Sequence, residues 1–260
     1  MKNLKIIVAY DKSSEDYRGR LTTFEESQKY QPGDVYVPVM GGHALGEIPD
    51  ELADMQGDDD GENISNLNRY LCELTHAYWA WKNQDKIGNP DYIGLCHYRR
   101  ILAPPSWLGA EDPETHMPTE IGLLPNYVVM CNATGYGSLN GLYLKKTCSP
   151  SLKDEGENLI AQLFPNMTEA DQTFYTKWKS WVLLAKHNAF IMPKEVFNDY
   201  MTKVEQAVTI LQPIFEGIDN GFYQTRAAEK LMEYFTAFYL DRLVNVGDYH
   251  CQHGTITYLA

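Results

Sequence analysis

The sequence predicts an α/β fold with a mostly parallel central sheet flanked by helices. The chain opens as strand, loop and strand, because the apolar run Ile6 to Tyr10 is followed by the β-branched run Val35 to Val39. A stretch with helical spacing then leads through a short turn into a third apolar run, Tyr92 to Cys96. This alternation is typical of layered α/β domains. With 260 residues the chain can bury one substantial core, so we expect a single domain.

In the first third of the chain, each element has its own signal. The run ending at Tyr10 is too short for a signal peptide or a membrane span and predicts a buried strand. Gly41-Gly42 marks a turn after the second strand, and residues 56–63 are too polar and glycine-rich for regular structure. Ile64 to Asn66 offers a helix cap, and one helix is expected from there to Lys82. Its apolar residues at helical spacing are Leu71, Leu74, Tyr78 and Trp81.

The rest of the chain begins with an irregular excursion from Ala103 to Ser151, rich in Pro, Gly, Asn and Thr. Strands are expected at 127–130 and 187–192. Thr168 to Asp171 resembles a capping box that starts an aromatic helix. The helices expected in this part are 153–164, 174–181, 193–211 and 223–243.

Net charge and cysteine usage limit the partners. The formal net charge of −13 argues against a nucleic-acid-binding protein, which needs a basic face, and against adhesion to anionic lipid. The five cysteines include no CxxC pair, so we expect reduced thiols in a cytoplasmic protein rather than disulfides or a zinc site. Membrane contact is expected to be peripheral at most, at the inner face.

The segment His97-Tyr98-Arg99-Arg100 directly follows the third apolar run. Loops at the carboxyl ends of strands form the ligand-binding crevice of open α/β sheets. The guanidinium fork matches phosphate oxygens and stays charged at any working pH. The segment therefore predicts a phosphate or diphosphate site. The alternatives are that Arg99 and Arg100 pair with surface carboxylates and that His97 is a core histidine satisfied by backbone groups.

A second charged cluster, Asp58-Asp59-Asp60, offers hard oxygen ligands suited to Mg²⁺ or Mn²⁺. We take Asp58 and Asp59 as candidate metal ligands. Three consecutive carboxylates cannot all face one ion in regular structure. The alternative is a solvent-exposed acidic turn.

Several blocks in order along the chain carry a resemblance to a known family. They are Ile6–Tyr10, Tyr36–Val39 with Gly41, Gly57–Asp59, Asn63–Ser65, Asn68, Cys72–Thr75, Tyr78–Asn83, Gly94–Arg100, Asn188–Met192, Arg226 and Glu229. With these blocks the chain resembles a bacterial family catalogued as a domain of unknown function, of the DUF4422 type. That family is found among capsule and exopolysaccharide glycosyltransferases.

The resemblance implies one GT-A-like domain over residues 1–260, with a nucleotide-sugar-binding half (1–102) and an acceptor and catalytic half (103–260). The implied enzyme moves a hexose, with galactose expected, from a UDP-sugar to an oligosaccharide or lipid-linked glycan acceptor in cell-surface polysaccharide biosynthesis. Residues 104–164 depart from the family pattern. Because that segment would shape the acceptor pocket, the acceptor is not carried over.

The resemblance also assigns roles. His97, Arg99 and Arg100 would hold the donor diphosphate where most GT-A enzymes use a metal bound by Asp-x-Asp, so both a metal-independent mechanism and a role for Mg²⁺ or Mn²⁺ are open. The residues expected to bind the donor nucleotide or sugar are Tyr10, Asn68, Thr75, Trp79 and Asn188. Instead of a metal, Asp58 and Asp59 could bind hydroxyl groups of the donor sugar. Instead of contacting the sugar, Trp79 could be a core residue.

If the reaction inverts the anomeric centre, a carboxylate must act as general base. We expect Glu229 or Asp171, with Glu73 as a third candidate. Each has a structural alternative. Glu229 can pair with Arg226, Asp171 can stabilise a helix start, and Glu73 can pair with Arg69. Two other classes of function stay open, a non-catalytic nucleotide- or glycan-binding module and a metal-dependent phosphoester hydrolase.

Overall fold

A computed structural model of the chain describes residues 3–11, 27–31, 33–46, 48, 52–106, 111–115, 117–119, 121–131, 138–139, 152–183 and 188–259. The chain divides into two compact units. The first is made of Met1–Asn132, Asn188–Asn198 and Cys251–Ala260, and the second of Ala133–His187 and Asp199–His250.

The first unit is built around an eight-stranded sheet with the order β3-β2-β1-β4-β5-β10-β6-β9, in which β4 also pairs with β9. The strands are β1 Leu4–Tyr10, β2 Tyr36–Met40, β3 Gln56–Gly57, β4 Tyr92–His97, β5 Arg100–Ala103, β6 Tyr127–Cys131, β9 Phe190–Pro193 and β10 His250–Tyr258. The pairings among β1 to β4 are parallel. The pairs β4–β5, β5–β10, β4–β9 and β6–β9 are antiparallel. The sheet is therefore mixed, and the expectation of a mostly parallel sheet is wrong.

Local connections explain the antiparallel part of the sheet. β5 follows β4 after only Tyr98 and Arg99, a turn that makes the chain reverse direction. β10 was not predicted, because its sequence is largely polar. Gly254 fits there since a Cβ would lie 2.7 Å from the Leu102 side chain. The short strand β3 also corrects the expectation of a loop throughout 56–63, because pairing with β2 supplies hydrogen bonds that the sequence does not reveal.

The segment expected as one helix is divided into α2 (Asn68–Leu71) and α3 (Leu74–Lys82). Cys72 interrupts it with a φ of 47°. The Asn68 side chain donates to the Cys72 carbonyl, which takes part in the irregular turn instead of a continuous helix. The expected cap is also wrong, because Ser65 binds Asp58 and caps no helix end.

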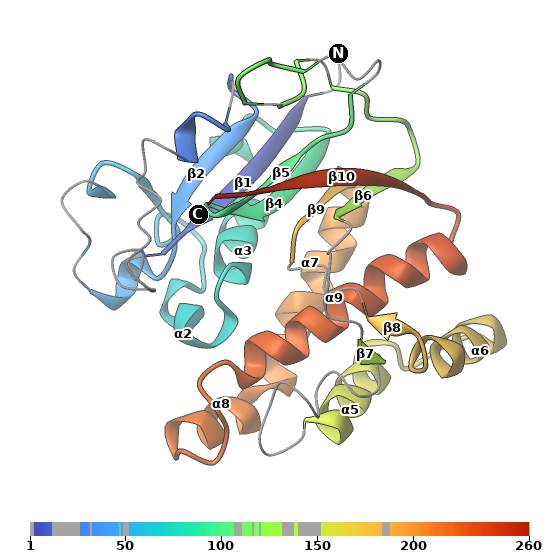
Figure 1. The fold of residues 1–260 in the computed structure, drawn as a ribbon. Coiled ribbons are helices and arrows are strands. Elements are labelled where there is room, and N and C mark those ends of the chain that lie inside the picture. The colour runs from blue at the N-terminus through green and yellow to red at the C-terminus, as the bar shows by residue number, and fades with distance from the viewer. Residues whose placement is uncertain are drawn as a thin grey trace. The chain divides into compact units, whose positions relative to one another are not determined.

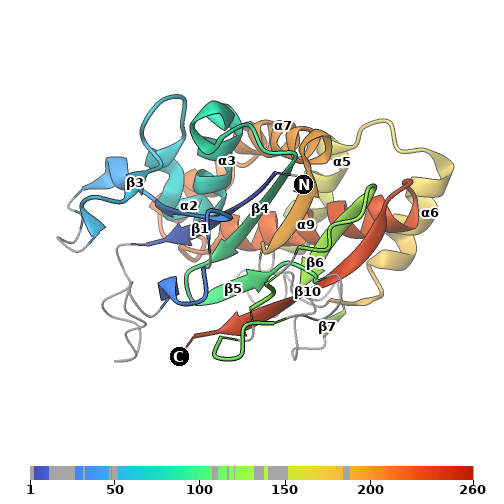
Figure 2. The ribbon, with the colours of Figure 1, turned by 90° about the horizontal axis from the view of Figure 1, so that it is seen from above.

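Layers of the first unit are visible in Figure 2, where α3 lies on one side of β1 and β4, and β5 with β10 on the other. The central strands are buried on both faces, which explains why their sequences are continuous apolar runs instead of alternating patterns. The predicted strands β1, β2 and β4 are confirmed. Among the described residues of this unit, 3₁₀ turns lie at His43–Leu45, Ser65–Leu67 and Gln84–Ile87.

Helices make up most of the second unit. They are α5 Lys153–Leu163, α6 Glu169–Trp178, α8 Gln212–Asp219, α9 Ala227–Asn245 and most of α7 Lys194–Ile210, whose first five residues belong to the first unit. α5, α6 and α8 contact α9 (Figure 1). The predictions of α5, α7 and α9 are confirmed, and α8 was not predicted. A two-stranded sheet pairs β7 (Ser138–Leu139) with β8 (Val182–Leu183).

The expected excursion over 103–151 contains the predicted strand, now β6. Residues 107–110, 116, 120, 132–137 and 140–151 of it lie outside the described residues. Within the part of the chain that the structure describes, no helix combines the length and apolar character needed to cross a membrane.

Candidate functional site

Four parallel strands of the first unit end at one edge of the sheet. In the register, Tyr10 pairs with Met40 and Ala9 with His97. The segments that leave this edge are Asp11, Gly41–His43, Asp58–Asp60 and Tyr98–Arg99. Three strand spacings of about 4.8 Å place β3 and β4 about 14 Å apart. The prediction that His97 to Arg100 follow the carboxyl end of a buried strand is confirmed, and this edge is where α/β sheets bind ligands.

The cationic cluster is folded on itself in the turn between β4 and β5. His97 Nδ1 accepts a hydrogen bond from the Arg99 backbone N–H at 3.2 Å, so the neutral ring carries its proton on Nε2. The Arg99 guanidinium lies 5.2 Å from the Tyr98 ring centroid, and the His97 and Tyr98 rings are 4.4 Å apart. Among described residues, Arg100 has no side-chain hydrogen bond or ion pair. Two arginines and an imidazole thus lie within four residues at this edge.

Two stacked tyrosines support this turn. The rings of Tyr10 and Tyr98 are 5.3 Å apart and inclined by 21°. The Tyr10 hydroxyl forms a hydrogen bond with Ser27 and accepts another from Gln31 at 2.9 Å. Burial raises the pKa of both phenols, so they stay neutral. Both rings are almost completely buried, which makes them a rigid support for the edge.

Asp58 is fully buried and satisfied by four protein donors. One carboxylate oxygen accepts from His43 N at 3.2 Å and from the Ser65 hydroxyl. The other accepts from Gly42 N at 3.2 Å and from Thr75 Oγ1 at 2.6 Å. Because a carboxylate has about four acceptor positions, none is left for a cation. Asp58 therefore fixes the loop after β2.

The other two carboxylates of the triplet turn to different partners. Asp59 accepts from His43 Nδ1 at 2.9 Å, and Asp60 pairs with Lys86 at 2.7 Å. Lys86 lowers the pKa of the exposed Asp60 carboxyl. Mg²⁺ and Mn²⁺ require several free oxygen ligands around one point. The donor set of the triplet does not fit a metal held by Asp58 and Asp59, and Asp59 with His43 stays at the edge as a hydrogen-bonding pair.

Three residues predicted to bind the donor, Asn68, Thr75 and Trp79, instead form hydrogen bonds that support the acidic loop Asp58–Asp60. Asn68 Nδ2 donates to Thr75 Oγ1 at 2.9 Å, and Thr75 in turn donates to Asp58. Trp79 is 1% exposed, and its indole N–H donates to the Asp60 carbonyl at 2.8 Å. The structure therefore places Thr75 and Trp79 in the core, where they position the acidic loop and present no surface to a sugar.

Asn188 and Glu73 add a carboxylate to the same edge. Asn188 Nδ2 donates to Glu73 Oε1 at 2.9 Å. In the antiparallel register Leu95 pairs with Phe190, so Asn188, which lies just before β9, is near the carboxyl end of β4. Asn188 is 1% exposed and has a φ of 49°, a left-handed conformation that asparagine tolerates better than most residues. Its side chain therefore fixes the direction of the Glu73 carboxylate.

The two carboxylates expected as general bases belong to the second unit. Glu229, in the first turn of α9, is 1% exposed and accepts from the Arg226 guanidinium, with Lys230 Nζ at 3.6 Å. The i, i+3 ion pair named as its structural alternative is therefore present. The role of Glu229 as a base stays a prediction.

Asp171 has the helix-start role named as its alternative. Its Oδ2 accepts from Thr168 N and Oγ1, and the capping box of α6 is complete. Its Oδ1 accepts from Arg242 Nε at 2.7 Å. Burial alone raises the pKa of the Asp171 carboxyl, but Arg242 and Thr168 outweigh burial and hold the pKa below its usual value. A carboxylate held in this way is a weak base.

Replacing Asp171 with Ala is expected to lower the free energy of unfolding by about 1 to 3 kcal/mol, because the cap and the ion pair are both lost. Since its folded pKa lies below the unfolded value of about 3.9, this contribution is present above that pH and disappears as pH falls through the folded pKa. Urea unfolding of both proteins between pH 7 and 3 measures the difference. Loss of enzymatic turnover at unchanged stability would contradict the structural role.

Several site residues were not predicted. His43, Ser65 and Ser27 contact Asp59, Asp58 and Tyr10, which lie 16, 7 and 17 residues away in the sequence. The sequence feature that could have pointed to His43 is the glycine pair Gly41-Gly42 directly before it. A Cβ on Gly41 would lie 2.1 Å from the His76 ring, which shows that a helix approaches the strand end closely here.

Comparison with known proteins gives two further findings. A search of curated proteins returned no match. Among solved structures, the chain is similar to the apo structure of the bifunctional glycosyltransferase WbbM, with 21% sequence identity and a TM-score of 0.67. The match covers 99% of this chain and 45% of that chain, so this chain spans less than half the length of WbbM. The likeness shows a shared fold.

The family resemblance read from the sequence is confirmed by a family model. The model described as "Domain of unknown function (DUF4422)" matches residues 21–244, which is most of the chain. This protein belongs to the DUF4422 family.

Proposed function

We propose that the protein is a glycosyltransferase that transfers a hexose, with galactose expected, from a UDP-sugar to an oligosaccharide or lipid-linked glycan during cell-surface polysaccharide biosynthesis. The observation that carries this proposal is the cluster of His97, Arg99 and Arg100 at the carboxyl edge of the parallel strands. The fold shared with the glycosyltransferase WbbM supports it.

The chemistry explains why this edge suits a nucleotide sugar. The bond between the anomeric carbon and the diphosphate oxygen breaks with both electrons going to UDP. The acceptor hydroxyl forms the new bond to that carbon and loses its proton to a base. Negative charge therefore grows on the diphosphate, and preorganised donors aimed at it stabilise the transition state. Arg99, Arg100 and the His97 Nε2–H are such donors.

Glu73 is the carboxylate of the first unit that we propose for contact with the donor sugar or the acceptor hydroxyl. Glu73→Gln is expected to lower turnover about a hundredfold while UDP affinity stays unchanged. Asn188→Gly keeps the left-handed backbone but removes the amide donor, and is expected to lower turnover about tenfold. Steady-state kinetics and UDP titrations measure both effects.

The matched control is Glu195→Gln, an exposed glutamate of the same unit that should behave as the wild type. Parallel losses of UDP affinity and stability in the Glu73 variant would assign this residue to the fold instead. Glu229→Gln in the same assay tests the base predicted in the second unit.

The test of the proposed function is a panel of UDP-sugars, each with and without EDTA. We expect UDP and one UDP-sugar to raise the melting temperature and one sugar to support UDP release with an acceptor. Because the acidic triplet does not fit a metal, activity is expected to survive EDTA. Absence of stabilisation by every nucleotide sugar would overturn the proposal.

The alternative of a non-catalytic nucleotide-binding module predicts UDP binding without turnover in the same panel. A metal-dependent hydrolase would need the acidic triplet as ligands. The four donors on Asp58 and the pairing of Asp60 with Lys86 give that alternative no support.

A further inference from the structure

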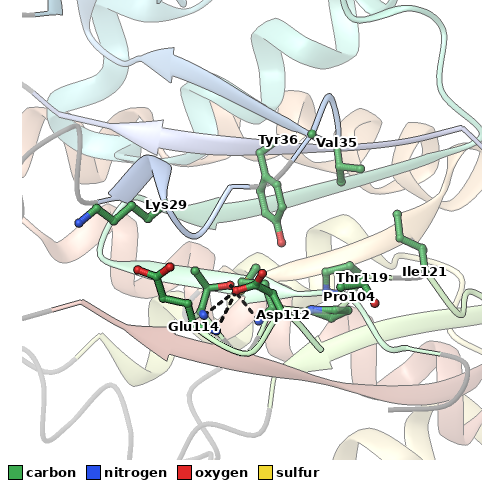
Figure 3. Close-up of a pocket in the computed structure, with 12 residues that line it drawn as sticks. Lys29, Val35, Tyr36, Pro104, Asp112, Glu114, Thr119 and Ile121 are labelled. Atoms are coloured by element: carbon green, nitrogen blue, oxygen red, sulfur yellow. Dashed lines mark hydrogen bonds between the residues drawn. The ribbon is translucent and has the colours of Figure 1, made fainter. Parts of the chain in front are cut away.

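A cavity of about 640 Å³ lies in the first unit between the start of β2 and the segment that follows β5. This volume is in the range of small-molecule sites. Its floor is apolar and includes the buried side chains of Tyr36, Pro104 and Met117. Figure 3 shows the Tyr36 ring pointing from β2 toward the loop that carries Asp112 and Glu114.

The rim of the cavity is polar. Lys29 stands on one side and Glu114 on the other, and both are exposed (Figure 3). Within the described part of the chain, neither side chain forms a hydrogen bond or an ion pair. Thr115 and Thr119 add hydroxyl groups to the same rim. An apolar floor below a polar rim is the composition expected of a ligand site.

The loop that carries Glu114 is held in place by its own hydrogen bonds. Asp112 Oδ1 accepts from Glu114 N at 3.1 Å, Thr115 N at 2.8 Å and Thr115 Oγ1 at 2.9 Å. Asp112 N donates to the Met117 carbonyl at 2.8 Å, and Glu111 forms a β-bridge with Pro118. The cavity wall is thus preorganised, which reduces the ordering cost of binding.

We propose that this cavity binds an uncharged hexose unit of the glycan acceptor, an inference that rests on the proposed function. A pyranose ring has apolar C–H faces that suit the Tyr36 ring and hydroxyls that suit Glu114 and Thr115. Two carboxylates face one lysine, so the lining favours a neutral ring over an anionic one. The anionic donor belongs to the cationic cluster instead.

The cavity lies at the start of β2, at the other end of this strand from the sheet edge that carries the cationic cluster, so it suits a hexose unit of the acceptor that is distant from the reacting hydroxyl. Lys29 lies between Ser27 and Gln31, which both contact Tyr10 at the end of β1. The other wall comes from Pro104 and from described residues between Asp112 and Ile121.

The first experiment is a titration of the full chain with neutral hexose disaccharides and with the corresponding hexuronic-acid disaccharides. Binding is followed by the ¹³C-methyl signal of Met117, assigned with Met117→Leu. We expect the neutral sugars to shift this signal and the uronic acids to leave it unchanged. Equal shifts with both sugars, or no shift with either, would overturn the proposal.

Variants locate the contact. Glu114→Gln is expected to weaken neutral-sugar binding about tenfold, since it removes a charged acceptor, whereas the matched exposed variant Glu195→Gln binds as the wild type. Unchanged affinity in Glu114→Gln would overturn the contact. UDP stabilisation is measured in parallel. If UDP binds but the disaccharides do not, only the proposed acceptor site is refuted. If no nucleotide sugar binds, the proposed function itself is refuted.

Discussion

Replacing Arg99 with Ala is expected to lower turnover by about 10²- to 10³-fold and UDP affinity at least tenfold. The guanidinium lies in the β4–β5 turn beside Tyr98, where it can meet the diphosphate as charge develops on the leaving group. Removing it takes away a preorganised cation at the sheet edge while the buried tyrosines stay in place. UDP titration and initial-rate kinetics measure the two effects.

Two further arginine variants sharpen this result. Arg99→Lys keeps the charge but not the planar fork, so an intermediate loss is expected. Arg69→Ala is the matched control, because Arg69 is an exposed arginine of the same unit whose guanidinium lies 4.4 Å from the Tyr70 ring centroid. Wild-type UDP affinity in Arg99→Ala would show that the arginine is structural and would remove the central support for the proposed function.

Replacing Asp58 with Ala is expected to lower the free energy of unfolding by about 3 to 5 kcal/mol, the cost of leaving buried donors without a charged acceptor. Four donors converge on this carboxylate, two from the Gly42–His43 backbone and two from the Ser65 and Thr75 hydroxyls. Denaturant unfolding measures the loss.

The control is Asp54→Ala, since Asp54 is exposed and without a described partner, and this variant should unfold as the wild type. A metal ligand would behave differently from a structural carboxylate. If Asp58→Ala kept its stability but lost an EDTA-sensitive activity, the structural assignment of Asp58 would be wrong.

Hydrophobic patterning was enough to predict most elements near the site. Continuous apolar runs predicted β1 and β4 because strands covered on both faces have no polar side. The capping box at Thr168 predicted the start of α6, since both of its hydrogen bonds are local. The position of the cations followed from order along the chain, because Arg99 comes directly after an apolar strand.

Contacts between different segments of the chain could not be predicted from the sequence. The acidic triplet was a reasonable metal site by composition, yet its carboxylates turn to Ser65, His43 and Lys86, and only the folded chain sets those directions. β10 was missed because its hydrogen-bonding partners come from β5, about 150 residues earlier in the chain.

The sequence by itself therefore determined the central strands β1, β2 and β4, most of the helices, the family and the cationic segment at a strand end, because each depends on neighbouring residues or on residue order. The tertiary structure alone decided which carboxylates are used up in the core, that Asn188 directs Glu73, and where a cavity opens beside β2. Those outcomes depend on distances between segments far apart in the chain, and a pattern of residue types does not contain them.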